Sequence, residues 1–216
     1  TPEPGAEIEV FGQRVTHMTP DAARRAGIAV IWQDLALFPE MSVAENIAFE
    51  TMLGRGPRPV SHRRLNEVAR LSLERLGVTL DLEARLRTLP IAERQIVAIA
   101  RALVQDARLI FMDEPTASLT QSETDALLTI VRNLAAKGVA VVFVSHRLQE
   151  VLDVCRRVTV VRDGKLVGVF PTQGMTPARL TELMTVGGSP MPRNDRVASA
   201  TMNVPREVVA TTMTGA

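Results

Sequence analysis

The 216-residue sequence predicts an α/β fold, a mainly parallel sheet with a helical subdomain inserted into it. From residue 108 to residue 162, apolar β-rich runs alternate with segments of helical periodicity, as parallel strands do with the helices that connect them. Between 41 and 104, by contrast, every expected regular element is a helix. The core is therefore expected in residues 1–40 and 105–188, with the helical subdomain in 41–104.

The amino-terminal half predicts two strands and three helices. Ser42 opens the first helix as N-cap, and Glu45 completes a capping box. Gly77 ends the next helix, because glycine readily adopts the left-handed conformation at a helix carboxyl end. The expected elements are strands over 6–11 and 28–33, a helix from 42, a loop over 54–60, and helices over 61–77 and 91–104.

The carboxyl-terminal half predicts the strand–helix alternation. Its expected elements are strands over 108–113, 139–145 and 157–162, and helices over 121–137 and 148–154. The dipeptide Asp163-Gly164 between two β-rich runs predicts a hairpin. Beyond 188 the sequence turns small, polar and proline-containing, so 189–216 is expected to be a tail or an interdomain linker.

Composition narrows the functional classes. A net charge of +1 gives no reason to expect a nucleic-acid partner. No stretch approaches the ~20 apolar residues that span a bilayer, and the acidic first residues do not resemble a secretory signal, so membrane association is expected through a partner. Cys155 is the single cysteine and is expected to be a buried small hydrophobe.

Three of the predicted strands end on polar side chains. The run before Asp113 and Glu114 delivers two adjacent carboxylates to the carboxyl edge of the sheet, where α/β proteins bind ligands. His146 and Gln33 stand at the ends of two further apolar strands. Paired acids suit Mg²⁺ and an attacking water, and a histidine can donate to a phosphate oxygen. Together these strand ends predict a phosphate–metal site.

In this order the motifs resemble the ATPase domain of ABC transporters, which has a P-loop NTPase-like sheet. The matching features are Gln33 (Q-loop), Leu109–Asp113 (Walker B strand), Glu114 (catalytic glutamate), Ala117–Thr120 (D-loop) and His146 (H-loop). The segments GIAVIWQDLALFPEMSVAENI, ERQIVAIARAL and RVTVVRDGKLVGV resemble the sugar-importer branch (ribose, xylose and galactose type). That branch usually carries two ATPase domains in tandem, and this chain resembles the first.

The resemblance implies roles for individual residues. Glu114, His146 and Gln33 are the implied catalytic residues, and Asp113 and Gln33 are the implied ligands of Mg²⁺. The segment aligned with the family signature reads Leu89, Pro90, Ile91, Ala92 and Glu93. The last four of these, with Ser118 of the D-loop, are the implied contacts to ATP.

Two features depart from the family pattern. In the signature segment Pro90 has neither a hydroxyl nor a backbone N–H, and Ala92 stands in place of a glycine. The loop G-x-x-x-x-G-K-[ST] is absent from the sequence, and neither Lys137 nor Lys165 belongs to one. We therefore expect an amino-terminally truncated ATPase domain that binds ATP poorly. Its sheet is expected to lack a central strand, which leaves the neighbouring strands unpaired.

The implied function is energy coupling in an ABC importer for a sugar, by ATP hydrolysis that uses Mg²⁺. The implied partners are transmembrane permease subunits, a second ATPase domain and, indirectly, a periplasmic solute-binding protein. The implied location is the cytoplasmic face of a bacterial inner membrane, as a peripheral subunit. Two alternatives stay open, a soluble ABC ATPase outside transport and a pseudo-ATPase interaction module. The interval of about 55 residues between Gln33 and Leu89 is short for the insertions of the soluble class.

Overall fold

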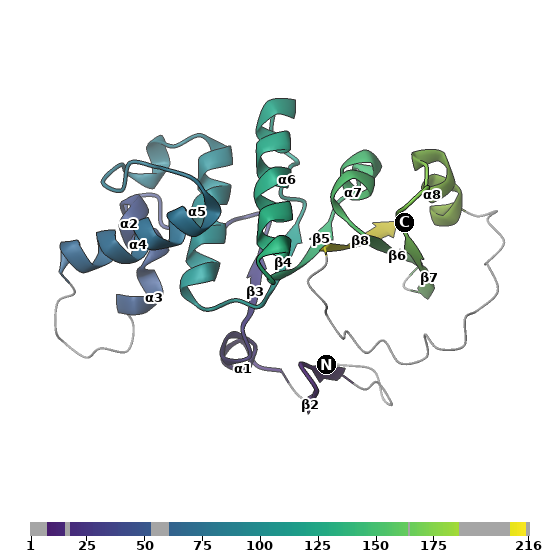
Figure 1. Ribbon diagram of the computed structural model, residues 1–216, viewed down its shortest axis with the longest axis horizontal. Coiled ribbons are helices and arrows are strands. Elements are labelled where there is room, and N and C mark those ends of the chain that lie inside the picture. The colour runs from purple at the N-terminus through teal and green to yellow at the C-terminus, as the bar shows by residue number, and fades with distance from the viewer. Residues whose placement is uncertain (1–7, 16–17, 53–60, 164, 186–207, 215–216) are drawn as a thin grey trace.

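A computed structural model describes residues 8–15, 18–52, 61–163, 165–185 and 208–214. Its centre is a six-stranded sheet in the order β3-β4-β5-β8-β6-β7 (Figure 1). The strands are β3 (Ile28–Ile31), β4 (Leu109–Asp113), β5 (Ala140–Val144), β6 (Arg157–Arg162), β7 (Lys165–Pro171) and β8 (Val208–Thr214). Neighbouring strands run parallel except β6 and β7, which form an antiparallel hairpin. The predicted mainly parallel sheet is confirmed.

The helices fall into a group inserted between β3 and β4 and a group outside that insertion. Between β3 and β4 the chain forms α2 (Val43–Ile47), α3 (Phe49–Met52), α4 (His62–Leu76), a 3-10 turn (Leu86–Thr88) and α5 (Ile91–Val104), at the left of Figure 1. The others are α1 (Pro20–Arg25), α6 (Gln121–Ala136), α7 (Leu148–Val154) and α8 (Pro177–Met184). The inserted helical subdomain is thus present, while its boundaries at 41 and 104 stay a prediction.

The predicted helix ends have the expected local causes. Ser42 and Glu45 exchange both hydrogen bonds of a capping box at the start of α2. Gly77 ends α4 with φ +73°, in the left-handed region that a glycine adopts without steric cost. The stripe that α4 buries includes Leu65, Ala69 and Leu73, which recur at helical spacing. These local signals therefore place the helices of the inserted subdomain.

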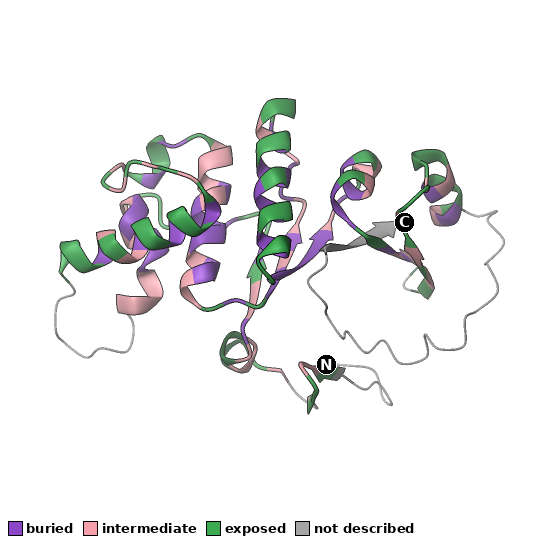
Figure 2. Cartoon of the chain, in the orientation of Figure 1, coloured by how far each residue is buried: buried purple, intermediate pink, exposed green. Residues whose placement is uncertain are grey.

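One continuous core joins the inserted helices to the sheet. Met112 and Phe143, on the inward face of β4 and β5, are fully buried in the same cluster as Ile47 and Leu73 of the inserted helices. Helix α6 has one side of buried residues and one exposed side, as Figure 2 shows. Cys155 belongs to this cluster, and burial strongly raises the pKa of its thiol, as expected for an unreactive structural cysteine.

The opposite face of the sheet carries a smaller apolar cluster. Leu109, Ala140 and Val142 form it, with Phe11 packed against it. Phe11 lies in the turn of a hairpin between β1 (Ile8–Val10) and β2 (Gln13–Val15), and the guanidinium of Arg108 sits 3.9 Å from its ring centroid. The strand predicted over 6–11 is present as β1. The return through Phe11 and Gly12 into β2 was not predicted.

One further strand was not predicted, because it forms by pairing with strands that are distant in sequence. Residues 208–214 lie in the predicted tail, yet they form β8, which pairs in parallel with both β5 and β6. Both strands thus have a hydrogen-bonded neighbour where we expected an unpaired one. A seven-residue run shows no such partner locally, because pairing with strands over 45 residues away decides its conformation. The predicted loop at 54–60 and the tail segment 189–207 lie outside the described residues.

The N-cap of α6 gives a testable contribution to stability. Thr120 accepts from Glu123 N, and the Glu123 carboxylate accepts from Thr120 N. Replacement Thr120→Ala is expected to lower the free energy of unfolding by about 1 kcal/mol, as loss of an N-cap hydroxyl does. Urea unfolding measures it, with Thr129→Ala on the exposed side of the same helix as control. An equal loss in both variants would show that the cap has no special contribution.

The same cap predicts a pH dependence. Hydrogen bonds from the side chain and the backbone of Thr120 lower the pKa of Glu123 below its usual 4.5. A lowered folded-state pKa means that the stabilisation is complete above the unfolded pKa and is lost as the pH falls. The difference in the free energy of unfolding between wild type and Thr120→Ala is therefore expected to be largest at neutral pH and to shrink below about pH 4.5.

Candidate functional site

The ends of three adjacent parallel strands assemble the candidate site. β3 pairs with β4 in a register that sets Ile31 opposite Met112, and β4 pairs with β5 so that Asp113 lies opposite Val144. Gln33, Asp113, Glu114 and His146 follow these positions by zero to two residues. All four thus lie at the carboxyl edge of the sheet, where the sequence placed them, and their roles stay a prediction.

Glu114 and His146 form the one side-chain hydrogen bond among these four described residues. The His146 Nδ1 atom lies 2.9 Å from Glu114 Oε1, and the backbone N–H of Glu114 donates to Val144 O at 2.9 Å. Glu114 has φ +44°, a conformation that costs a residue with a Cβ some strain and is found disproportionately at functional sites. The Glu114 side chain is 32% exposed, so a water molecule can reach its carboxylate.

Asp113 and Glu114 supply the oxygen ligands that Mg²⁺ prefers. Asp113 is half-buried, and its carboxylate has no hydrogen bond within the described residues. Those residues contain no group of three or more His, Cys, Asp and Glu that could enclose a metal ion. Mg²⁺ commonly binds one or two carboxylates and takes its other ligands from waters and substrate phosphates. The edge therefore fits Mg²⁺ that arrives with a phosphate compound.

Gln33 stands at the same edge on an exposed turn. It follows the exposed Trp32 and makes no hydrogen bond to the other three site residues in the described part of the chain. Two residues later the buried Leu35 anchors the turn in the core. Gln33 is thus brought near the site by the strand and is left free to reach a ligand.

A buried hydrogen-bond network ties the segment after Glu114 to the segment after His146. Glu150 of α7 accepts from Thr116 Oγ1 at 2.5 Å and from Arg147 Nη1 at 3.1 Å. Arg147 also donates to the carbonyl oxygen of Ala117 at 3.4 Å. The sequence analysis did not predict this network. The one local signal for it was an acid, Glu150, among the buried residues of a short helix. Ser118, in the segment that resembles the D-loop, is exposed.

The signature-like segment forms the start of α5. Pro90 is the N-cap and is exposed, and it makes no side-chain capping bond. Ile91, Ala92 and Glu93 form the first turn, so the backbone N–H groups and the helix dipole that attract anions are present there. The segment thus offers the backbone donors of a helix amino end, and its N-cap residue, Pro90, has no hydroxyl.

The chain's lysines lie away from the carboxyl edge of β4 and β5. Lys137 is the C-cap of α6 and precedes β5, which places it toward the amino edge of the sheet. Its ammonium group donates to Arg75 O instead. Lys165 begins β7, which β6 and β8 separate from β5. Neither lysine therefore supplies a phosphate contact at the candidate site.

These features define a class of protein. A mainly parallel sheet whose carboxyl edge carries an Asp–Glu pair, with a glutamine and a histidine on the flanking strands, is a P-loop NTPase-like domain. A family model described as ABC transporter matches residues 1–117, which is more than half of the chain. The chain belongs to the ABC transporter family. None of its described helices is long and apolar enough to cross a membrane.

Curated relatives agree with the sugar-importer branch. Ribose import ATP-binding protein RbsA 2 of Streptomyces avermitilis is 45% identical over 182 residues, 82% of this chain and 35% of the relative. RbsA 1 of Streptomyces coelicolor is 46% identical over 177 residues, 80% of this chain and 34% of the relative. A putative ribose/galactose/methyl galactoside import ATP-binding protein of Rhizobium meliloti is 45% identical over 165 residues, 76% of this chain and 32% of the relative. The chain thus spans about a third of the length of these relatives.

Solved structures agree on the fold. The cassette MJ0796 in a post-hydrolysis dimer with ADP and Pi superposes with a TM-score of 0.62 at 20% identity, over 78% of this chain and 74% of that one. A nucleotide-free cassette from an ABC transporter gives 0.65 at 21% identity, over 80% and 70% of the two chains. At these identities the likeness establishes the ABC ATPase fold.

Proposed function

We propose that this chain is part of an energy-coupling subunit of an ABC importer whose solute is a sugar of the ribose, xylose and galactose type. The family membership and the names of the relatives support it. The observation that carries the proposal is the Glu114–His146 contact of 2.9 Å, next to the Asp113 carboxylate, which accepts no hydrogen bond from the described residues. This is the arrangement of groups that can bind a metal-bound phosphate and activate water.

In the proposed reaction, Glu114 orients the attacking water and accepts its proton. His146 holds the Glu114 carboxylate through its ring N–H, and its exposed ring can turn toward a phosphate oxygen. Asp113, with Gln33, is proposed to hold Mg²⁺, which supplies charge stabilisation on the phosphate when bound. The buried Glu150 keeps the Glu114 and His146 segments in register.

The proposed assembly follows from the same family membership. ATP and Mg²⁺ are the proposed substrate and ion, and a second ATPase domain completes the site across an interface that includes Pro90–Glu93 and Ser118. Transmembrane permease subunits are proposed to dock on the helical subdomain, which places the chain at the cytoplasmic face of the inner membrane. A periplasmic solute-binding protein acts through the permease.

A transport assay tests this function. The domain is expressed in a version extended to include a phosphate-binding loop, together with candidate permease and solute-binding proteins, in cells that lack their own sugar importers. Uptake of ribose, xylose or galactose that depends on the extended protein is expected. ATP hydrolysis with no uptake of these sugars would favour a soluble ABC ATPase. The absence of both hydrolysis and uptake would favour an interaction module.

The signature-like segment predicts a gain of activity. In the extended tandem protein, Pro90→Ser together with Ala92→Gly is expected to raise the steady-state ATPase rate. The change restores a hydroxyl donor and a close backbone approach beside the phosphate of the partner domain, and one such donor contributes up to ~10²-fold. The matched control is Pro39→Ser, an exposed proline outside the segment. An unchanged rate in the double variant would mean that this half-site is idle or that backbone donors suffice.

A further inference from the structure

The guanidinium of Arg101 binds the turn that follows Gln33. Its Nη1 donates to the Ala36 carbonyl oxygen at 3.0 Å, and its Nη2 donates to the Leu35 carbonyl oxygen at 3.3 Å. Arg101 belongs to α5, about 65 residues further along the chain. One planar side chain thus fixes two successive backbone groups, two and three residues after a proposed catalytic residue.

The bound turn has a conformation that needs support. Ala36 has φ +48°, in the left-handed region where a Cβ is unfavourable. The neighbouring Leu35 is buried in the core. Strained backbone persists where surrounding groups determine it, and two hydrogen bonds from Arg101 hold the carbonyl groups of Leu35 and Ala36. Without them, the exposed Gln33 has a less defined position relative to β4.

Two opposing effects act on the pKa of Arg101. Burial lowers the pKa of this guanidinium, and the carboxylate of Glu50 raises it. Glu50 also pairs with Arg24 of α1 at 3.3 Å. Arg101 and Leu35, with Trp32, line a groove of about 500 Å³ beside β3. The Arg101 head group therefore sits where the inserted helices meet the first strand of the core.

Helix α5 connects this contact to the signature-like segment. Its first residue, Ile91, lies ten residues before Arg101, which is about 15 Å along a helix. A helix of this length moves as a rigid rod, so a shift at its amino end moves Arg101 and the carbonyl groups bound to it.

We propose that Arg101 is a positioning residue that couples α5 to Gln33 by holding the Leu35 and Ala36 carbonyls. The proposal rests on the proposed function only for the role of Gln33 in hydrolysis. The contact itself joins two parts of the chain whatever reaction follows. A change in the position of the signature-like end of α5 is thereby transmitted to the Gln33 turn.

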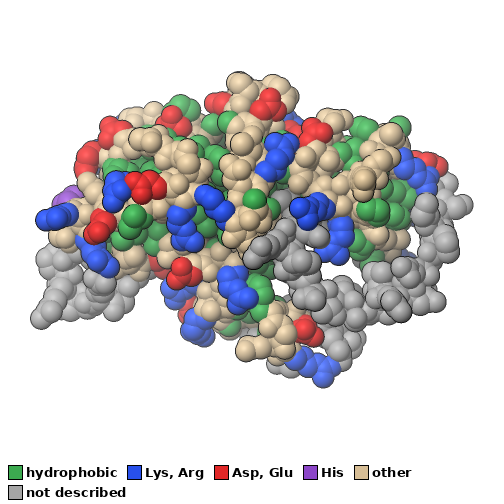
Figure 3. Space-filling model, in the orientation of Figure 1, with side chains coloured by type: hydrophobic (Ala, Val, Ile, Leu, Met, Phe, Trp, Pro, Cys, Tyr) green, Lys and Arg blue, Asp and Glu red, His purple; other side chains and the backbone are tan. Residues whose placement is uncertain are grey.

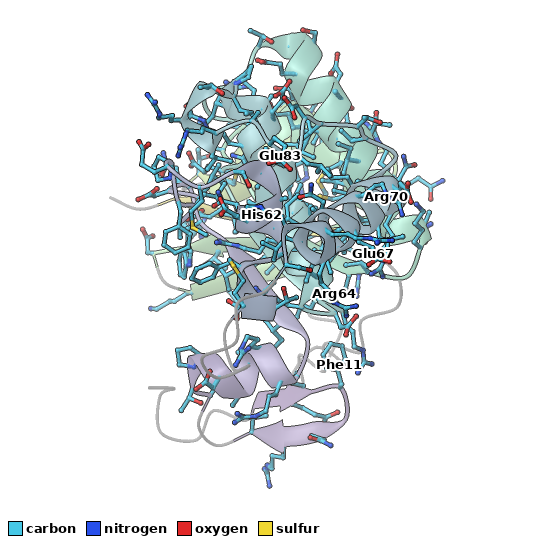
Figure 4. The ribbon with its side chains drawn as sticks, turned by 90° about the vertical axis from the view of Figure 1, so that its left-hand side faces the viewer. Phe11, His62, Arg64, Glu67, Arg70 and Glu83 are labelled. Atoms are coloured by element: carbon cyan, nitrogen blue, oxygen red, sulfur yellow. The ribbon has the colours of Figure 1, made fainter. Side chains whose placement is uncertain are left out.

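The single tryptophan of the sequence gives a direct test in the 216-residue chain. Trp32 is 58% exposed and adjoins Gln33, so its emission reports on this turn. Arg101→Gln and Arg101→Lys are expected to shift Trp32 emission to longer wavelength and to lower its anisotropy. Arg101→Lys is expected to have the smaller effect, because its ammonium group can still donate to one of the two carbonyl oxygens that the guanidinium binds. The control is Arg70→Gln, which removes an exposed arginine of α4 (Figure 4). Arg70 pairs with Glu74, and the change is expected to leave both signals unchanged.

Fluorescence and turnover together decide the proposal. If Arg101→Gln loses its far-ultraviolet circular dichroism, the folded Arg101→Lys variant carries the same test. Emission and anisotropy equal to wild type in a folded Arg101 variant would overturn the coupling.

In the extended protein, Arg101→Lys is expected to lower kcat about tenfold while KM for Mg-ATP stays within twofold. An altered fluorescence with unchanged kcat would overturn the positioning of Gln33. An inactive extended parent would contradict the proposed function alone, since the fluorescence test needs no hydrolysis.

Discussion

Replacement Glu114→Gln is expected to reduce ATP hydrolysis by about 10²- to 10⁴-fold in an extended protein that carries this domain and a phosphate-binding loop. The amide has the shape of the carboxylate, so the backbone hydrogen bond to Val144 and the contact with His146 can persist. It cannot accept a proton from water at neutral pH. Nucleotide affinity is expected to change by less than a factor of about three, because phosphate affinity comes chiefly from other groups.

The measurement combines steady-state phosphate release with equilibrium nucleotide binding on the same preparation. Glu74→Gln, an exposed glutamate on α4, is the control and is expected to leave both unchanged. A loss of nucleotide binding as large as the loss of turnover would assign Glu114 to metal binding or to structure. His146→Ala is the informative companion, because the two side chains touch and their effects are expected to be less than additive.

The strand ends of the candidate site were predictable because their cause is local. Each apolar run that ends on Gln33, Asp113 or His146 carries its own signal, and the rule that ligands bind at the carboxyl ends of parallel strands supplies the common edge. The caps of α2 and α4 were predictable for the same reason. Mixed red and blue side chains over the helices in Figure 3 agree with the near-zero net charge.

The missed features depend on residues that are distant in sequence. β8 acquires its partners from strands at 140–144 and 157–162, and nothing within its own seven residues indicates them. The Arg101 contact joins residues 65 apart, and the Thr116–Glu150 bond joins residues 34 apart. Sequence periodicity indicates which side of a helix is buried, but it does not indicate which carbonyl group a half-buried arginine such as Arg101 reaches.

The 216-residue chain itself is expected to bind Mg-ATP more weakly than about 1 mM and to hydrolyse none of it. Triphosphate affinity in this class depends on a cradle of backbone amides with its lysine, and the sequence contains no G-x-x-x-x-G-K-[ST]. Lys137 caps α6 beyond the amino edge of the sheet, and Lys165 lies on the far hairpin. The described carboxyl edge instead presents the acids Asp113 and Glu114, which repel phosphate unless Mg²⁺ accompanies it.

Isothermal titration of the purified chain with Mg-ATP decides this prediction, since it needs no turnover. A version extended to include the phosphate-binding loop is the positive control and is expected to give a saturable heat. Both proteins share every described site residue, so a difference between them isolates the contribution of the loop. Micromolar affinity of the 216-residue chain would mean that another segment supplies the phosphate contacts. Loss of that affinity in Asp113→Asn would then show that it acts through Mg²⁺ at the same edge of the sheet.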